Sequence, residues 1–211
     1  VSKYFKDFNF IISDRVPEAF DLSKDFNLPS FGISHFTWDW FFYYVCKVKS
    51  EHIKKMENSF NKCDHFFFPP FTPEKILTKY KEKISPINFI VGEFRKKIKK
   101  NNFKKCLIMD NGTRSLSKLI NQTVPYLKKI KNMEFYVCID HLDEKFKNEI
   151  FISNNIVPVS GLRNMHQKLS EADMVIARGG FNTISECLVL KKPEIFFNEK
   201  NNPEVSENLR L

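Results

Sequence analysis

The sequence contains few of the residues that mark collagen-like, disordered or disulfide-stabilised proteins. Its 211 residues include only 6 Gly, 10 Pro and 5 Cys. These counts exclude a collagen repeat, a Pro/Gly-rich disordered chain and a small disulfide scaffold. With 42% hydrophobic and 28% charged residues, the chain has the composition of a globular protein that buries a core. Its length allows one large domain or two small ones.

Long apolar segments are also missing. The most aromatic stretch, residues 36–45, is too short to cross a bilayer and contains Asp39. The first residues, VSKYFK, lack the apolar core of a secretory signal. No two cysteines form a C-x-x-C pair, so we expect free, buried thiols in a reducing compartment. The expected localisation is cytoplasmic.

Several motifs of metal and nucleotide chemistry are absent. The sequence has no Asp-x-Asp, no G-x-x-x-x-G-K-[ST] and no H-E-x-x-H, and its His and Cys residues never cluster at ligand spacing. We therefore expect neither a metal nor a cofactor, and a leaving anion must then be stabilised by backbone N–H groups, a helix dipole and cationic side chains.

A sharp change in composition suggests a domain boundary. Residues 71–105 hold eleven Lys or Arg against three Asp or Glu, nearly all of the net charge of +9. We expect a basic linker at residues 71–104, between a partial N-terminal domain at 1–70 and a C-terminal domain at 105–211. Only six of the 34 basic residues are Arg, which argues against nucleic acid binding. Peripheral contact with the inner face of a membrane stays open.

Apolar runs alternate along the chain with segments typical of helices. Strands are expected over residues 8–13, 29–34, 66–70, 105–110, 134–139, 155–159, 174–177 and 194–197. Helices are expected over residues 18–26, 38–57, 115–129, 164–172 and 182–190, and from about residue 203. This alternation with short connections predicts an α/β fold with parallel, doubly wound sheets.

The most specific motif follows the strand at residues 174–177. There Arg178, Gly179 and Gly180 lead into a helix that carries Thr183 and Glu186. Glycines let a diphosphate approach the backbone, and the helix N-terminus stabilises its charge. Arg178 would add forked donors, and Glu186 would accept hydrogen bonds from ribose hydroxyls.

A purely structural interpretation of the same residues stays open. Thr183-x-x-Glu186 fits a capping box, and Gly-Gly before a helix also fits a tight turn. A second loop, residues 110–115, also joins a strand to a helix and contains Gly112 and Thr113. We expect it to face the same cleft, although Asn-Gly alone is also a common turn signal.

Residues 172–186, followed by Lys192-Pro193 and the region around residue 207, resemble the donor-site half of GT-B glycosyltransferases. The similarity is to the family 28, peptidoglycan N-acetylglucosaminyltransferase type, and covers about residues 105–211. The resemblance implies two Rossmann-like parallel-sheet domains. The donor-binding residues that it implies, together with the candidates named above, are Gly112, Thr113, Arg178, Gly179, Gly180, Asn182, Thr183, Glu186, Glu207 and Asn208. Asn208 stands where the family usually has the longer Gln.

The first part of the chain has its own similarity. Residues 13–19 and 34–40 resemble the acceptor-side domain of the same superfamily and the glycosyltransferase-like region of plant-type arabinokinases. The strand and glycine loop expected upstream are missing, so we expect an incomplete N-terminal domain and a truncated chain. His35 is the first candidate for the catalytic base and Asp14 the second. His35 also fits a packing role, and Asp14 a helix cap.

These observations predict a metal-independent glycosyltransferase. Its donor would be a nucleotide-diphosphate sugar, UDP-linked, and its acceptor an unidentified hydroxyl. Alternatives are a nucleotide-sugar hydrolase or epimerase on the same scaffold, a non-catalytic nucleotide-sugar binding module, and a basic domain that binds polyanions.

Overall fold

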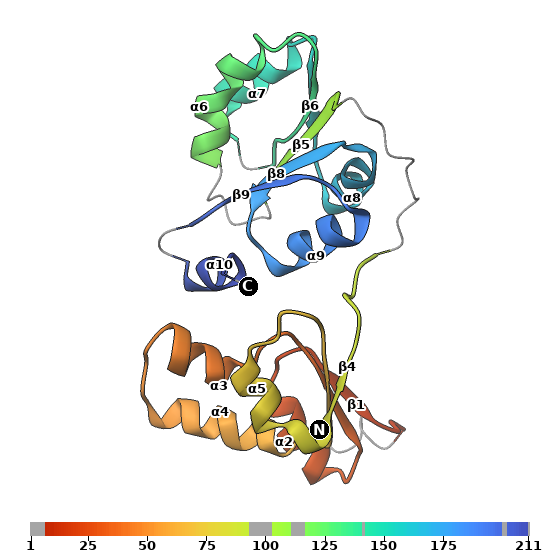
Figure 1. Ribbon diagram of the computed structural model, residues 1–211, viewed down its shortest axis with the longest axis vertical. Coiled ribbons are helices and arrows are strands. Elements are labelled where there is room, and N and C mark those ends of the chain that lie inside the picture. The colour runs from red at the N-terminus through yellow and green to blue at the C-terminus, as the bar shows by residue number, and fades with distance from the viewer. Residues whose placement is uncertain (1–6, 93–102, 111–116, 141, 200–201, 211) are drawn as a thin grey trace. The chain divides into compact units, whose positions relative to one another are not determined.

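The chain folds into two compact units, divided between Phe89 and Ile90. The computed structural model describes residues 7–92, 103–110, 117–140, 142–199 and 202–210, and every structural statement below concerns these residues. Each unit has its own parallel sheet with helices packed against it (Figure 1). The expected fold class, α/β with two parallel sheets, is confirmed.

The first unit contains a four-stranded sheet in the order β1-β2-β3-β4, with every pair parallel. In chain order its elements are β1 (Ile11–Ser13), α2 (Glu18–Asp25), β2 (Ser30–Ile33), α3 (Trp38–Trp40), a π-helical turn (Phe41–Val45), α4 (Glu51–Asn61), β3 (His65–Phe68), α5 (Glu74–Lys79), a 3-10 turn (Lys81–Lys83) and β4 (Ile84–Pro86). Parallel pairing brings the carboxyl ends of all four strands to one edge of the sheet.

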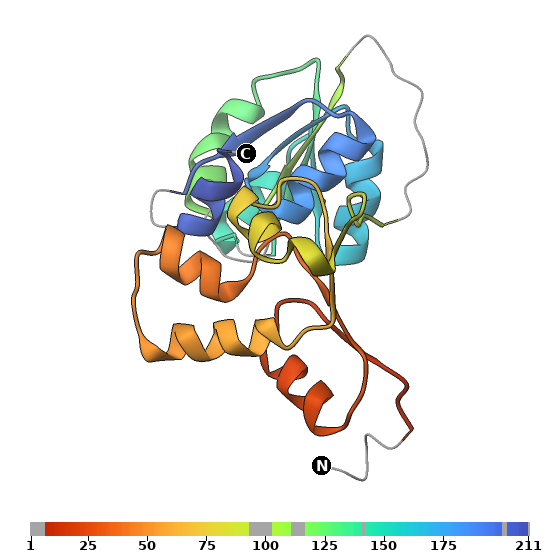
Figure 2. The ribbon, with the colours of Figure 1, turned by 60° about the horizontal axis from the view of Figure 1, so that its bottom comes forward.

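The described helices of the first unit share one core with the sheet (Figure 2). Phe20 of α2, Phe60 of α4 and Ile76 of α5 pack together with Phe66 of β3. The tightest point is Gly32 of β2, where an added Cβ would lie 2.3 Å from the Phe66 ring. Only glycine leaves room there for an aromatic ring to lie against the strand.

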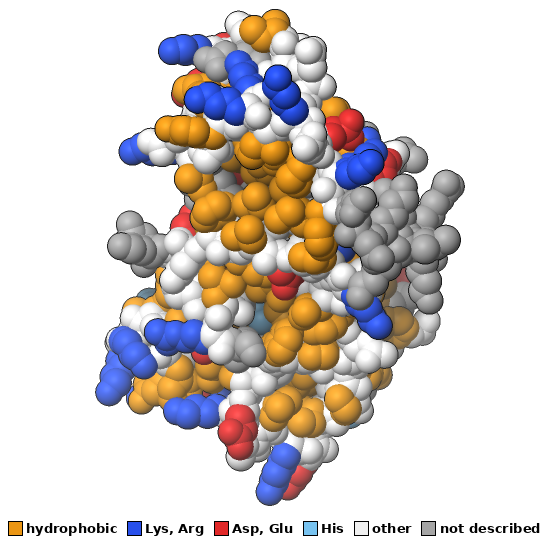
Figure 3. All heavy atoms as spheres, turned by 45° about the horizontal axis from the view of Figure 1, so that its top comes forward, with side chains coloured by type: hydrophobic (Ala, Val, Ile, Leu, Met, Phe, Trp, Pro, Cys, Tyr) orange, Lys and Arg blue, Asp and Glu red, His pale blue; other side chains and the backbone are white. Residues whose placement is uncertain are grey.

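The opposite face of this sheet is also apolar. Phe31 and Phe67 stack on it with ring centroids 6.1 Å apart. Phe10 meets the Phe31 ring edge-on and, like Ile12, is exposed. Figure 3 shows many hydrophobic side chains, in orange, at the surface of the side that it presents. Residues of a parallel strand are commonly apolar on both faces, which explains why these strands were recognisable in the sequence.

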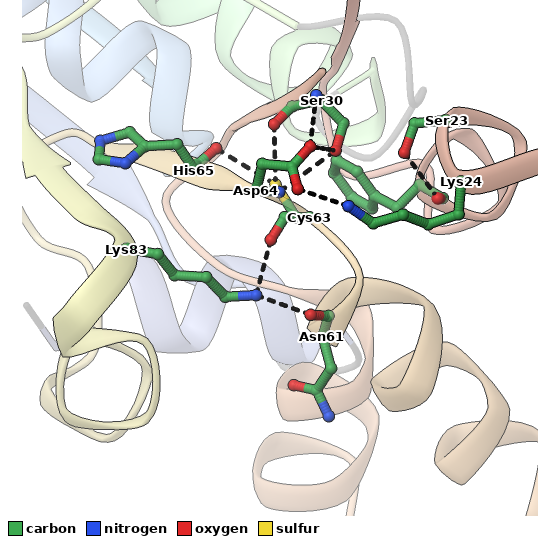
Figure 4. A network of polar contacts seen from close by, with 9 residues as sticks. Ser23, Lys24, Ser30, Asn61, Cys63, Asp64, His65 and Lys83 are labelled. Atoms are coloured by element: carbon green, nitrogen blue, oxygen red, sulfur yellow. Dashed lines mark hydrogen bonds and ion pairs between the residues drawn. The ribbon is translucent and has the colours of Figure 1, made fainter. Parts of the chain in front are cut away.

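The amino-terminal edge of the first sheet is closed by polar contacts (Figure 4). Asp64 accepts hydrogen bonds from the Ser30 backbone N–H at 2.9 Å and from the Ser30 hydroxyl at 3.0 Å, and it pairs with Lys24. Lys83 donates to the Cys63 carbonyl at 2.7 Å. Burial alone raises the pKa of Asp64, but Lys24 and Ser30 outweigh it and hold the pKa below its ordinary value. The edge is therefore structural.

The prediction of a single helix over residues 38–57 is wrong. The chain forms α3 and the π-helical turn, passes through Lys47 with a positive φ of 59°, and begins α4 after Ser50. The Ser50 hydroxyl caps α4 by accepting from the Ile53 N–H at 3.4 Å. Two helices replace one because the aromatic half packs into the core while a cap at Ser50 starts a new helix.

Part of the segment expected to be a linker is folded. Of residues 71–104, the stretch from Glu74 to Pro86 forms α5, the 3-10 turn and β4, and β4 pairs with β3. Pro73 directly precedes α5 and Pro86 ends the edge strand β4. Both are positions at which proline is compatible with regular structure.

The second unit has a five-stranded parallel sheet in the order β7-β6-β5-β8-β9. Its elements are β5 (Lys105–Met109), α6 (Ser117–Leu127), β6 (Glu134–Cys138), α7 (Glu144–Phe151), β7 (Ile156–Val159), α8 (Leu162–Glu171), β8 (Met174–Arg178), α9 (Phe181–Leu190), β9 (Glu194–Phe197) and α10 (Pro203–Asn208). The expected strands are all present, and α7 is a helix that the sequence analysis did not predict.

Helices cover both faces of the second sheet. Val124 of α6 and Ile150 of α7 belong to the core on one face. Leu169 of α8 and Cys187 of α9 belong to the core on the other, as the positions of these helices in Figure 1 indicate. The chain is therefore doubly wound around this sheet, as the alternation predicted.

The cysteines are free thiols, and four of the five are buried. Burial raises the pKa of Cys106 to about 12 and that of Cys63 to about 11, so these two thiols stay protonated at neutral pH. Among the helices in the described ranges, none is long and apolar enough to span a bilayer.

Replacing Gly32 tests the packing of the first unit. We expect Gly32→Ala to lower the free energy of unfolding by about 1–3 kcal/mol, because the new methyl group overlaps the Phe66 ring. Urea denaturation measures the change. The double variant Gly32→Ala/Phe66→Leu should lose less unfolding free energy than the sum of the losses measured for the two single variants. Strict additivity would contradict the contact.

Candidate functional site

The centre of the second sheet is a topological switch point. Strands β5 and β8 are parallel neighbours, with Met109 opposite Ala177. The chain leaves β5 for α6 on one face and leaves β8 for α9 on the other. Open α/β sheets bind ligands beyond the carboxyl ends of strands at such a point. The two segments singled out in the sequence begin at these strand ends, since Asp110 directly follows β5 and Gly179 directly follows β8.

The loop after β8 delivers the backbone to a helix start. Arg178 is the last residue of β8, and Gly180, which has no side chain, is the N-cap of α9. The first N–H groups of a helix have no carbonyl partner within it, and the helix dipole adds partial positive charge there. This end of α9 is thus suited to stabilise an anion such as a diphosphate.

Glu186 lies one turn further along α9. Its carboxyl group is largely buried, with Oε1 3.4 Å from Nδ1 of His166 on α8. Burial raises the pKa of Glu186, and the charge of His166 partly opposes that shift. The capping-box interpretation is wrong, since the N-cap is Gly180 and Thr183 already lies inside the helix. Glu186 is therefore a buried acceptor with no capping role.

The two glycines have different surroundings. An added Cβ on Gly179 would lie 2.7 Å from the Leu209 side chain, directly after α10. The Gly179 carbonyl accepts a hydrogen bond at 3.2 Å from Nδ2 of Asn208, which is buried. Asn208 was expected to contact the donor sugar; here it ties α10 to the glycine loop. Glu207 is partly exposed, and its Oε2 atom lies 3.6 Å from Nη1 of Arg210.

Arg178 is held at the same edge. Its Nη1 atom lies 3.4 Å from Oε2 of Glu199, in the loop after β9. The same oxygen accepts a hydrogen bond from Asn202 Nδ2 at 2.9 Å. Glu199 therefore fixes the guanidinium and partly balances its charge.

Two of the four other predicted residues, Asn182 and Thr183, lie within the described part of the chain. Asn182 is exposed in the first turn of α9, whereas Thr183 is buried. Gly112 and Thr113 lie outside the described residues. Asp110, which precedes them at the end of β5, is buried and accepts a hydrogen bond from the Ser117 hydroxyl at 3.4 Å.

The first unit places both candidate bases at one edge of its sheet. Asp14 follows β1 and His35 follows β2, and these strands pair in parallel. Asp14 is exposed and lies 3.3 Å from Arg15. It does not cap α2, whose N-cap residue is Pro17. His35 is only 6% exposed and packs against Phe36 with ring centroids 4.6 Å apart.

Sequence reasoning missed His166. It lies on α8, beside the apolar face formed by Met165 and Leu169, and no motif marks it. Only the packing of α8 beside α9 brings it to Glu186. In the described ranges no three His, Cys, Asp or Glu side chains group as metal ligands.

The comparisons with known proteins agree with this geometry. Residues 111–209 match the model of the glycosyltransferase family 28 C-terminal domain. No curated protein matches the sequence. The match covers the switch-point loops, α9 and α10.

Solved structures show the same fold over the whole chain. One is Phytolacca americana UGT2 complexed with UDP-2fluoro-glucose and pterostilbene (TM-score 0.63, 13% identity, 95% of this chain and 59% of that chain). Another is the glycotransferase of kitacinnamycin (TM-score 0.67, 15% identity, 99% and 62%). A third is Acinetobacter baumannii MurG (TM-score 0.57, 14% identity, 99% and 59%). The chain has the GT-B fold and spans about three fifths of the length of these proteins.

A substitution at Asn208 tests whether this residue has a structural role or the donor-binding role that the sequence predicted. We expect Asn208→Ala to lower the free energy of unfolding by about 1–2 kcal/mol, because it removes a buried hydrogen bond to the Gly179 carbonyl. Thermal or urea denaturation measures this, with Glu207→Ala as a control at the neighbouring, partly exposed position. Unchanged stability of Asn208→Ala would show that the bond contributes nothing.

Proposed function

We propose that this protein is a glycosyltransferase that takes a sugar from a nucleotide-diphosphate donor, UDP-linked, and transfers it to an acceptor hydroxyl. The second unit would bind the donor, and residues at the carboxyl edge of the first unit would act on the acceptor. The observation that carries the proposal is the N-terminus of α9, which begins at Gly180 directly after β8 at the switch point, with the largely buried Glu186 one turn along.

The N-terminus of α9 suits the diphosphate. A glycosyl transfer without a metal leaves a nucleoside diphosphate whose developing charge needs fixed donors and cations. Backbone N–H groups of the first turn supply donors that need no reorganisation. Arg178, fixed by Glu199 at the same edge, adds a cation. UGT2, whose structure contains UDP-2fluoro-glucose, shares this fold and supports the choice of donor.

Glu186 suits the nucleoside. A buried, ionised carboxylate accepts hydrogen bonds from two vicinal ribose hydroxyls, and such bonds gain strength in a site of low dielectric. His166, 3.4 Å away, orients the carboxyl group and favours its ionised form. The donor specificity would therefore include the ribose as well as the diphosphate.

The acceptor hydroxyl needs a base from the first unit. The sequence ranks His35 before Asp14, but His35 is buried against Phe36 whereas Asp14 is exposed at the adjacent strand end. Proton abstraction requires direct reach of the hydroxyl or one bridging water. The exposure of Asp14 makes it the better placed of the two, and His35 then supports the edge by packing.

Glu186→Gln tests the donor site. We expect it to weaken UDP binding by about 1–3 kcal/mol, since a neutral amide accepts more weakly than a carboxylate. Affinity of the wild type should fall as the pH drops through the raised pKa of Glu186, above its ordinary value of 4.5. The variant should show no such loss. His166→Ala should move the fall to higher pH, because it removes the charge that lowers the pKa. Isothermal titration calorimetry with UDP measures all three.

The matched control for this experiment is Glu144→Gln, at an exposed glutamate on α7 of the same unit. Its UDP affinity should equal that of the wild type. Equal affinity of Glu186→Gln and the wild type at every pH would remove Glu186 from the site.

Variants of the two candidate bases test the acceptor side. We expect Asp14→Asn to lower turnover by roughly 10²–10⁴-fold, the range of general base catalysis, while UDP affinity is unchanged. His35→Asn should reduce stability more than turnover. The rate is measured as the release of UDP during sugar transfer from UDP-glucose. Normal turnover of Asp14→Asn would exclude it as the base.

A further inference from the structure

Helices of the first unit enclose a pocket whose lining lies entirely within the described part of that unit. It has a volume of about 1350 Å³. Its walls come from α3, the π-helical turn, the following loop, α4 and α5, and Figure 2 shows α3 and α4 joined by that loop. Helices α3 and α5 follow the neighbouring strands β2 and β3. No residue assigned above to donor binding or catalysis lines it.

Aromatic side chains form one wall of this pocket. Trp40, Tyr43 and Tyr44 line it, and both tyrosines are exposed. The Trp40 and Tyr44 ring centroids lie 6.1 Å apart, and Lys75 Nζ lies 4.0 Å from the Tyr44 centroid. The rings offer flat apolar surfaces that a ligand with an apolar face can cover.

A polar network forms the other wall. Lys79 Nζ donates to Oδ2 of the buried Asp39 at 3.0 Å and to Oε1 of Glu57 at 2.8 Å. Burial lowers the pKa of Lys79, but Glu57 and Asp39 outweigh it and keep the ammonium charged. The second oxygen of Asp39 and the indole Nε1 of Trp40 are buried and have no hydrogen-bond partner among the described residues. Both atoms are closed off from solvent, so the groups of this wall that a ligand can reach are the Lys79 ammonium and the Glu57 carboxylate.

The charges around the pocket balance. Its lining includes four Asp or Glu and four Lys side chains, so neither an anion nor a cation is favoured by net charge. A purely apolar ligand would desolvate these groups without replacing their hydrogen bonds, at a cost in free energy. A matching ligand is uncharged, carries hydroxyls that both donate to carboxylates and accept from ammonium groups, and has one flat apolar face. A pyranose ring has these properties.

We propose that the pocket between α3, α4 and α5 binds a neutral saccharide. The sugar ring stacks on the exposed tyrosines, and its hydroxyls bond to the Asp39–Lys79–Glu57 network. Binding needs neither a nucleotide nor a transfer step, so it stands or falls independently of the donor site.

The two tryptophans make the pocket directly observable. The sequence contains only Trp38 and Trp40, so the ¹H–¹⁵N spectrum of the full chain has two indole signals, and Trp38→Phe assigns them. Titration with cellobiose should shift the Trp40 signal progressively and saturably, with a Kd of roughly 1 mM. Tyr43→Ala should weaken this binding at least several-fold, and Lys79→Gln should do the same.

Tyr126→Ala is the matched control, since Tyr126 is exposed on α6 of the second unit. It should bind cellobiose as the wild type does, and all variants should keep the wild-type affinity for UDP. If neither cellobiose nor N-acetylglucosamine shifts the Trp40 signal in the wild-type chain, the proposal is overturned. A larger response to p-cresol than to either sugar would overturn it too, because it would identify an apolar site.

Discussion

The parallel pairing of β5 with β8 is the contact on which the candidate donor site depends. These strands follow one another in space but are separated in the chain by β6 and β7. Because the chain turns to opposite faces after β5 and β8, their carboxyl ends lie side by side at a switch point, where open α/β sheets bind ligands. The same pairing puts the N-terminus of α9 at this point, and α8 and α9 share the core on one face of the sheet. Without this pairing, the glycine loop would begin a helix but would have no second strand end beside it.

At the start of α9, the backbone and the side chains have different roles. Gly180 begins α9 without a side-chain cap, which leaves the first turn suited to an anion. Gly179 instead allows Leu209 to pack against the strand end, and its carbonyl is bound by Asn208. A pair of glycines that looks like one phosphate motif therefore combines the residue that begins a helix with a residue that allows close packing. Glu186 is then held by His166, a residue from another helix.

The first unit shows a comparable division between the two edges of its sheet. Hydrogen bonds and ion pairs around Asp64 close the amino-terminal edge. The carboxyl edge carries Asp14 and His35, and the helices that follow β2 and β3 enclose the pocket with the Asp39–Lys79 pair. The stabilising contacts around Asp64 and the residues proposed for recognition therefore lie at opposite ends of the same strands, and ligand sites of parallel sheets usually lie beyond the carboxyl ends.

The sequence by itself determined the elements whose signals are local. Continuous apolar runs predicted the strands and their parallel arrangement, since strands buried on both faces need no alternation. It missed the break at Ser50 and the helix and strand within residues 74–86, because a high density of lysine looks the same in a linker and on the exposed face of a folded segment. Only the tertiary structure decided which side chains meet. The contacts of Glu186 with His166, and of Asn208 with Gly179, join residues about 20–30 positions apart, and no local pattern encodes them because they depend on how helices pack across the sheet.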